Sequence, residues 1–297
     1  MKVIDLFAGC GGMTQGFQDA GHEVVAGFDH WKPAMDIYAA NFDHPIFDVD
    51  LSDADAVQTL LQFEPEVIIG GPPCQDFSIS GKRQQGERAN LTVQYGHLVA
   101  QVKPTWVVFE NVYNVTRFDS LSRMKNVLSQ AGYGLSAKVL DASYFGAPQA
   151  RKRYFLVGKL GEEDGFFEEK LLEGRSEVPM TVRDYLGDRL KTNFYYMHPR
   201  SYNRRAVFSI DEPAATIRGI NRPIPKNYAA HRGDAALIAN GVRALTTRER
   251  ALIQTFPDHF KLPGTKTNVE LAIGNAVPPK LAYHVASKII EYESSRR

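Results

Sequence analysis

Short apolar runs alternate with amphipathic stretches through the first half of the chain. Runs typical of buried parallel strands lie at residues 2–7, 24–28, 46–49, 66–70, 106–109, 135–140 and 153–158. The stretches between them predict helices at residues 13–20, 31–41, 53–62, 91–102 and 119–131. This alternation of strand and helix predicts an α/β fold with a doubly wound, mostly parallel sheet.

The pattern changes near residue 160, where periodic segments give way to scattered Pro, Gly, Arg and Tyr. Such a composition is typical of a separate, loop-rich domain. Periodicity returns in a helix expected at residues 246–254, with Thr246 as its N-cap and Glu249 at the capping-box position. A final amphipathic helix over residues 280–293 has an apolar face that we expect to dock on the sheet.

We therefore expect two domains. A larger, catalytic domain comprises residues 1–174 and 268–297, and a smaller, irregular domain comprises residues 175–267. A chain of 297 residues with 43% hydrophobic residues has enough apolar material for this arrangement.

The net charge of +1 hides an uneven distribution. Residues 1–70 carry 2 basic and 12 acidic side chains, whereas residues 189–232 carry 9 basic and 2 acidic ones. This asymmetry indicates a basic face on the smaller domain, which suits a polyanionic partner. A solvated surface with counter-charges nearby in the fold is the alternative.

Two cysteines, Cys10 and Cys74, are too few for a disulfide framework or a four-cysteine zinc site, and we expect no metal. No apolar run approaches the ~18 residues that a membrane span needs. The N-terminus enters a strand at once and carries no signal peptide. These features favour a reducing, cytoplasmic compartment.

The first strand is followed by a glycine-rich turn, residues 9–12, that lets a ligand approach the backbone closely. A dinucleotide fingerprint would need a third glycine where this chain has Thr14, which disfavours a nicotinamide oxidoreductase. Asp29 and Asp50 follow the next two strands, where carboxylates can accept ribose hydroxyls and an adenine amino group. Either carboxylate alone is more typical of a helix cap. Three such strand ends together favour S-adenosylmethionine over NAD.

Cys74 and Glu110 follow two successive strands, so a parallel sheet would bring both to one crevice. A lone cysteine is usually a small buried hydrophobe, and Glu110 alone would be interpreted as part of a helix N-terminus. Together they suit methylation at carbon 5 of a pyrimidine. A thiolate can add to carbon 6, and a carboxylic acid of raised pKa can contact ring nitrogen 3.

The sequence resembles the DNA (cytosine-5)-methyltransferases of bacterial restriction–modification systems over nearly its whole length. The segments that carry the resemblance, in family order, are Asp5–Gly12, Pro72–Gln75, Glu110–Val112, Gln149–Arg153, Arg248–Arg250 with Gln254–Pro257, and Gly274–Pro279. The resemblance implies a methyltransferase fold related to the Rossmann fold, with a target-recognition domain at residues 175–267.

The resemblance also implies roles for individual residues. Cys74 would be the nucleophile, Glu110 would contact nitrogen 3, Arg153 the cytosine carbonyl oxygen, and Arg151 the active-site loop and a phosphate. The cofactor pocket would be lined by Phe7, Gly9, Gly11, Gly12, Asp29, His30, Trp31, Asp50, Pro73, Leu91 and Asn275. The family usually has Glu at the position of Asp29, and either His30 or Trp31 would stack on the adenine.

The partner implied is double-stranded DNA, from which the target base must be extruded. We expect residues 78–90 to form a lid, and the DNA contacts to come from Ser78, Ser80, Lys82, Arg83, Arg204, Arg205, Thr216, Arg218 and Arg222. The enzyme would be a monomer in the bacterial cytoplasm, acting on a short site; the sequence leaves open whether a restriction endonuclease accompanies it.

Two alternatives share this catalytic fold. An RNA cytosine methyltransferase of the transfer-RNA branch would carry a Cys-Phe-Thr tripeptide late in the chain, which is absent here. A catalytically silent DNA-binding relative should have lost the cysteine, the glutamate or the cofactor glycines, and all of these are present.

Overall fold

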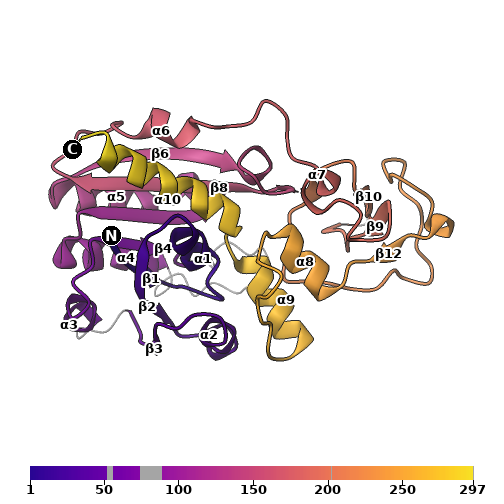
Figure 1. Cartoon of the computed structure of the whole chain (residues 1–297), viewed down its shortest axis with the longest axis horizontal. Coiled ribbons are helices and arrows are strands. Elements are labelled where there is room, and N and C mark those ends of the chain that lie inside the picture. The colour runs from indigo at the N-terminus through magenta and orange to yellow at the C-terminus, as the bar shows by residue number, and fades with distance from the viewer. Residues whose placement is uncertain (52–55, 74–88, 202, 297) are drawn as a thin grey trace.

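The computed structural model describes residues 1–51, 56–73, 89–201 and 203–296. Its main feature is a seven-stranded sheet in the order β3-β2-β1-β4-β5-β8-β6 (Figure 1). The strands are β1 (Lys2–Leu6), β2 (Glu23–Asp29), β3 (Ile46–Asp48), β4 (Val67–Gly70), β5 (Trp106–Val112), β6 (Tyr133–Asp141) and β8 (Lys152–Leu160). β8 is antiparallel to both of its neighbours, and the other pairs are parallel. The expected doubly wound, mostly parallel sheet is confirmed.

Helices cover both faces of this sheet. On one face α1 (Gly12–Asp19) packs along α10 (Pro279–Ser294), and Phe17, Leu281 and Val285 share a core with the strand residue Trp106. The C-terminal helix therefore docks on the sheet as expected (Figure 1). The other face is covered by α3 (Ala56–Leu61), α4 (Ala89–Val102) and α5 (Asp119–Gln130), with α2 (Lys32–Ala39) beside β2 and β3. Short elements η2 (Tyr113–Arg117), η3 (Ala142–Tyr144) and α6 (Glu168–Leu172) complete this part.

The loop-rich segment forms a smaller body beside the sheet (Figure 1). Its elements are α7 (Val182–Leu186), β9 (Phe194–Tyr196), β10 (Val207–Ser209), β11 (Ala214–Ala215), η4 (Ile238–Asn240), β12 (Arg243–Ala244) and α8 (Thr247–Ile253). A three-stranded sheet has the order β10-β9-β12, while β11 pairs in parallel with β7 (Gln149–Ala150). The capping box of Thr246 and Glu249 is formed as expected.

The ten-residue helix α9 (Lys266–Asn275) was not expected from the sequence, and neither were the short helices α6 and α7. Thr265 caps it by accepting a hydrogen bond from the backbone N–H of Asn268. Buried residues lie on several sides of α9, among them Val269, Ala272 and Gly274, so its sequence lacks a one-sided apolar stripe. Periodicity is therefore a poor guide to this helix.

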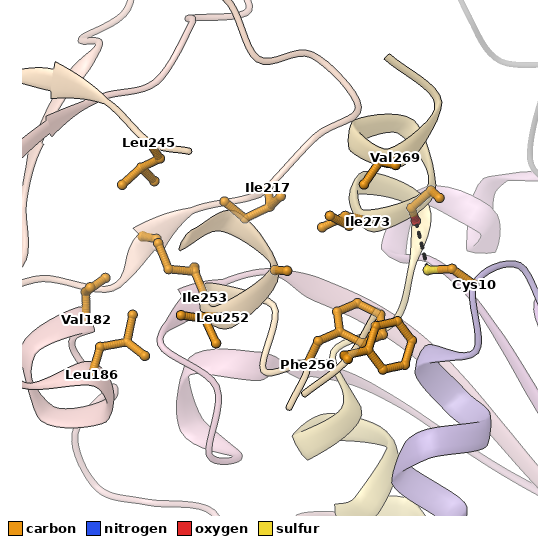
Figure 2. Packing of buried hydrophobic residues seen from close by; sticks show 14 of the residues in the cluster. Cys10, Val182, Leu186, Ile217, Leu245, Leu252, Ile253, Phe256, Val269 and Ile273 are labelled. Carbon is orange, nitrogen blue, oxygen red and sulfur yellow. Dashed lines mark hydrogen bonds between the residues drawn. The ribbon is translucent and has the colours of Figure 1, made fainter. Parts of the chain in front are cut away.

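The sheet and the smaller body share one hydrophobic cluster (Figure 2). Cys10 beside the glycine turn and Tyr38 of α2 belong to the same cluster as Ile217, Phe256 and Ile273. This shared core fixes the smaller body against the end of the sheet where the glycine turn lies. Among the described residues no helix is long and apolar enough to cross a membrane.

Candidate active site

A buried acid–base pair occupies the end of β5. The antiparallel ladder sets Glu110 opposite Phe155 and Val112 opposite Arg153, so Glu110 and Arg153 project from the same face of the sheet. Arg153 Nε lies 2.9 Å from Glu110 Oε1, with side-chain exposures of 13% and 9%. The sequence-predicted pair is thus brought together.

The electrostatics of Glu110 suit an acid. Burial raises the pKa of its carboxyl, although the positive charges of Arg153 and Arg151 oppose this shift. Glu110 Oε1 is buried and has no aligned hydrogen bond within the described part of the chain, despite its ion pair with Arg153. A polar atom left in this way can receive or give a hydrogen bond to a substrate.

The loop after β4 is fastened to the same place. Asn111 Nδ2 donates a hydrogen bond to the Pro72 carbonyl oxygen at 3.1 Å. A Cβ at Gly71 would lie 3.0 Å from Glu110 Oε2, so glycine lets the loop pass close to the carboxylate. Residues 78–88 of the lid expected at 78–90 lie outside the described residues, as do Cys74, Ser78, Ser80, Lys82 and Arg83.

Arg151 is buried and links separate segments of the chain by hydrogen bonds, so it is not an exposed contact. It is 1% exposed, and its guanidinium donates to the carbonyl oxygens of Ile217, Gly274 and Ala276 at 2.9, 2.9 and 2.8 Å. The expected support of a loop fits these bonds. The expected phosphate contact does not fit such burial, because both terminal nitrogens of the guanidinium already donate to backbone carbonyls.

Two buried glutamines extend the hydrogen-bond network of Arg151. Neither of them received an individual role from the sequence. Gln149 Oε1 accepts from the backbone N–H of Ile217, and Gln149 Nε2 donates to Gln254 Oε1 at 2.7 Å. Gln254 Nε2 in turn donates to the carbonyl oxygen of Ile273. Their only sequence signal was their place in the motif segments. The network joins β7, the segment after β11, α8 and α9 around the Glu110 end of the sheet.

The glycine turn has the close packing expected of a ligand cradle. Gly9 and Gly11 have φ of +56° and +89°, in the left-handed region that favours glycine. A Cβ at Gly11 would lie 2.2 Å from the Phe42 ring, whereas nothing lies within 4 Å of one at Gly9. Phe7, the residue after β1, also has a positive φ of +59°, an uncommon backbone conformation that often marks functional sites.

Asp29 closes this cradle. Its carboxylate accepts hydrogen bonds at 2.8 Å from the backbone N–H groups of Gly9, His30 and Trp31. The exposed His30 ring lies 2.6 Å from Asp48, which raises the pKa of His30. Trp31 packs against the shared hydrophobic cluster.

The remaining predicted cofactor residues lie at the surface or partly buried. β3 ends at Asp48, one residue before the expected end at residue 49, and Asp50 is exposed beyond it. Pro73 and Asn275 are exposed, and Leu91 of α4 is half-buried. Gly12 packs against the Val277 carbonyl, 2.2 Å from where its Cβ would lie.

Thr14 has a structural reason to replace glycine. Its hydroxyl donates to Asp5 Oδ2 at 2.7 Å and lies 3.0 Å from the hydroxyl of Tyr38, which lies 2.7 Å from His44 Nε2. Burial raises the pKa of Asp5 to about 7. This network under the glycine turn was not expected.

Cys10 is not a reactive thiol. It is 1% exposed, and burial raises its pKa to about 12. Its Sγ lies 3.5 Å from the Ala272 carbonyl oxygen in the shared cluster (Figure 2). Cys10 therefore acts as a small hydrophobe.

The predicted DNA-contacting residues differ in their exposure and in their bonding partners. Thr216 donates to the Ala150 carbonyl at 2.8 Å, next to the Arg151–Arg153 segment, and lies at a hollow of about 540 Å³ that Lys152 also lines. Arg204 and Arg222 are exposed, and Arg218 is partly buried. Arg205 differs, because it is ion-paired with Glu212 and lies over the Phe208 ring. Within the described residues no cluster of His, Cys, Asp and Glu could hold a metal ion.

Comparisons with known proteins agree with this site. The model of the C-5 cytosine-specific DNA methylase family matches residues 1–291. The chain is 50% identical to the type II methyltransferase M.HindV of Haemophilus influenzae, over 99% of this chain and 97% of that protein. It is 48% identical to M.HgiDI of Herpetosiphon aurantiacus, over 100% of this chain and 96% of that protein.

Solved structures share the fold at lower identity. The S. pombe Dnmt2 methyltransferase aligns with a TM-score of 0.76 and 18% identity over 99% of both chains. The Entamoeba histolytica methyltransferase EhMeth aligns with a TM-score of 0.68 and 17% identity over 100% of this chain and 98% of the other. From its family match and its close relatives, the chain belongs to the C-5 cytosine-specific DNA methylases.

Proposed function

We propose that this protein transfers a methyl group from S-adenosyl-L-methionine to carbon 5 of a cytosine flipped out of a short, specific double-stranded DNA site. The observation that carries the proposal is the buried pair of Glu110 and Arg153, next to the loop that leads into Cys74. Family membership favours DNA over RNA as the substrate.

The chemistry divides between three side chains. The Cys74 thiolate adds to carbon 6, while Glu110 in its acid form gives a proton to nitrogen 3 and so takes up the developing charge. Arg153 donates to the cytosine carbonyl oxygen. Carbon 5 then becomes nucleophilic and accepts the methyl group. Loss of the carbon-5 proton, for which we propose ordered water as the base, expels the thiolate. The proton on nitrogen 3 returns to the Glu110 carboxylate, so the ring and the acid are both restored, and S-adenosyl-L-homocysteine is the product left by the methyl donor.

The glycine turn suits the methyl donor. Asp29 lies at the end of β2 with one oxygen bound to the Gly9 N–H, and the side of Gly9 where a Cβ would project is open. Asp29 and Asp50 would hold the ribose and the adenine, His30 or Trp31 would stack on the adenine, and Phe7, Gly11, Gly12, Pro73, Leu91 and Asn275 would complete the pocket. When bound there, S-adenosylmethionine supplies an electrophilic methyl group.

The smaller body would hold the DNA. We assign target recognition to residues 175–267, and catalysis to residues 1–174 and 268–297. The relatives above are named type II methyltransferases, and we infer that this protein too is functionally paired with a restriction endonuclease.

Bisulfite sequencing of random plasmid DNA, incubated with the protein and S-adenosylmethionine, tests this proposal. We expect complete conversion everywhere except at one cytosine of a short recurring sequence. Cys74→Ala should abolish the protection, and Cys10→Ala is the matched control that should retain it. Conversion at every site with the wild-type protein would overturn the proposed activity.

A further inference from the structure

Nine of the twelve arginines in residues 175–267 carry this argument, and they differ in whether an acidic side chain pairs with them. The other three are Arg175, Arg232 and Arg248. Five are held by acidic side chains within ion-pair distance: Arg183 by Asp211, Arg189 by Asp258, Arg205 by Glu212, Arg243 by Glu249, and Arg250 by Glu270. Four others form no ion pair with any described residue, and we call them the arginine cluster: Arg200, Arg204, Arg218 and Arg222.

The arginine cluster gathers around His198. Arg218 donates a hydrogen bond to the His198 carbonyl oxygen. Burial lowers the pKa of Arg218, and the charges of Arg200, Arg250 and Arg204 lower it further. Burial likewise lowers the pKa of His198, and the charges of Arg222 and Arg218 add to that shift. These like charges therefore repel one another. Because five of the other arginines are paired with acids and these four are not, the surface around His198 is left ready for an anionic ligand.

Arg218 differs from the other members in being held in place. Arg200, Arg204 and Arg222 are exposed, whereas Arg218 is partly buried. The backbone carbonyl of Arg218 accepts a hydrogen bond from the buried Arg250. The next residue, Gly219, lies so close to α9 that a Cβ at Gly274 would be 2.2 Å from its nitrogen. A fixed guanidinium loses less freedom when it binds a ligand.

Arg218 is also close to the catalytic edge along the chain. Two residues earlier, the Thr216 hydroxyl donates a hydrogen bond to the Ala150 carbonyl oxygen. The Ile217 carbonyl oxygen accepts a hydrogen bond from the Arg151 guanidinium. A guanidinium fixed near the target base has the right chemistry for the O6 and N7 acceptors of guanine, its commonest specific contact in the major groove. Exposed arginines without such fixing suit phosphates, which position the DNA without reading it.

We propose that Arg218 reads a guanine near the target cytosine, and that Arg200, Arg204 and Arg222 bind the flanking phosphates. This inference rests on the proposed function. It predicts a recognition sequence with a required guanine other than the one that pairs with the target cytosine.

The test is methylation of a duplex library with degenerate positions around a cytosine, read by bisulfite sequencing. The wild-type protein should require the guanine, and Arg218→Ala should lose this preference by roughly ten- to a hundredfold. Arg222→Ala should keep the sequence preference, and should lower the slope of log affinity against log salt by about 1. The ion-paired Arg189→Ala is the matched control and should change neither.

Arg218→Gln guards against a variant that fails to fold. Its side chain stays polar, and its amide should shift the preference at the same position from guanine toward adenine. A wild-type sequence without such a guanine, or Arg218 variants that retain it in full, would overturn the inference. Absence of any methylated cytosine with the wild-type protein would instead contradict the proposed function.

Discussion

The Glu110 end of the large sheet and the arginine cluster of the smaller body use charge in opposite ways. Glu110 and Arg153 are buried, paired and fixed by neighbouring strands of a regular ladder. Three members of the arginine cluster are exposed, and none is paired with a described acid. Chemistry requires a fixed geometry in a dry environment, where an acid can keep its proton. Recognition requires charge that the protein itself has not neutralised.

The largest effect is expected from Glu110→Gln, which removes the acid from the catalytic end of the sheet. The amide keeps the size of the side chain and removes the acidic proton, so the single-turnover rate should fall by roughly 10²–10⁴-fold. In the wild type the rate should also fall as pH rises through the raised pKa of Glu110, because the acid form is lost. Rapid-quench measurements on both proteins over a series of pH values report both effects. An unchanged rate in the variant would remove Glu110 from the mechanism.

A second change breaks the contact that joins the two regions. Glu270 of α9 is buried and accepts from Arg250, Asn221 and Thr247 at 2.6, 2.6 and 2.8 Å. Glu270→Ala leaves the Arg250 charge buried without its partner, which should lower the free energy of unfolding by about 3–5 kcal/mol.

Urea unfolding checks this expectation. The matched control is Asp36→Ala, which removes the exposed partner of Lys32 and should change the free energy of unfolding by less than about 0.5 kcal/mol. Equal losses in the two variants would show that the buried pair does not stabilise the contact between the regions.

A pH-dependent effect is expected at Asp5, which lies in the hydrogen-bond network under the glycine turn. The pKa of Asp5 is raised from 3.8 to about 7 by burial, so the folded protein binds more protons than the unfolded chain between these values. The free energy of unfolding should therefore fall as pH rises across this window. Asp5→Asn should remove about 4 kcal/mol of that fall. Thermal unfolding of wild type and variant over this range tests the expectation; parallel curves would contradict it.

The sequence predicted the regular part of the molecule well, for a physical reason. Buried parallel strands carry a local signal, and their carboxyl ends must meet at one edge, so Asp29 and Glu110 could be placed before any coordinates. The family resemblance added Arg153, which the ladder then set beside Glu110.

Long-range contacts were beyond such reasoning. The burial of Arg151 depends on carbonyls from residues 217 and 274–276, and α9 lacks a one-sided apolar face. Both Arg205 and Arg218 were predicted to contact DNA, and the sequence did not distinguish them. Only the fold shows that Arg205 forms an ion pair with Glu212. Composition revealed a basic segment, but only the fold could show which of its charges remain unpaired.

The central claim is that Cys74 forms a covalent bond to carbon 6 of the target cytosine. A duplex with 5-fluorocytosine at the target position tests it most directly. Fluorine takes the place of the carbon-5 proton and cannot be removed by a base, so the thiolate cannot be expelled after methyl transfer. Intact mass spectrometry should find a stable adduct of protein and methylated DNA strand. The bond should map to Cys74, and Cys74→Ala should form none. Methylation of normal DNA without any adduct on the fluorinated duplex, or an adduct at Cys10, would contradict the account.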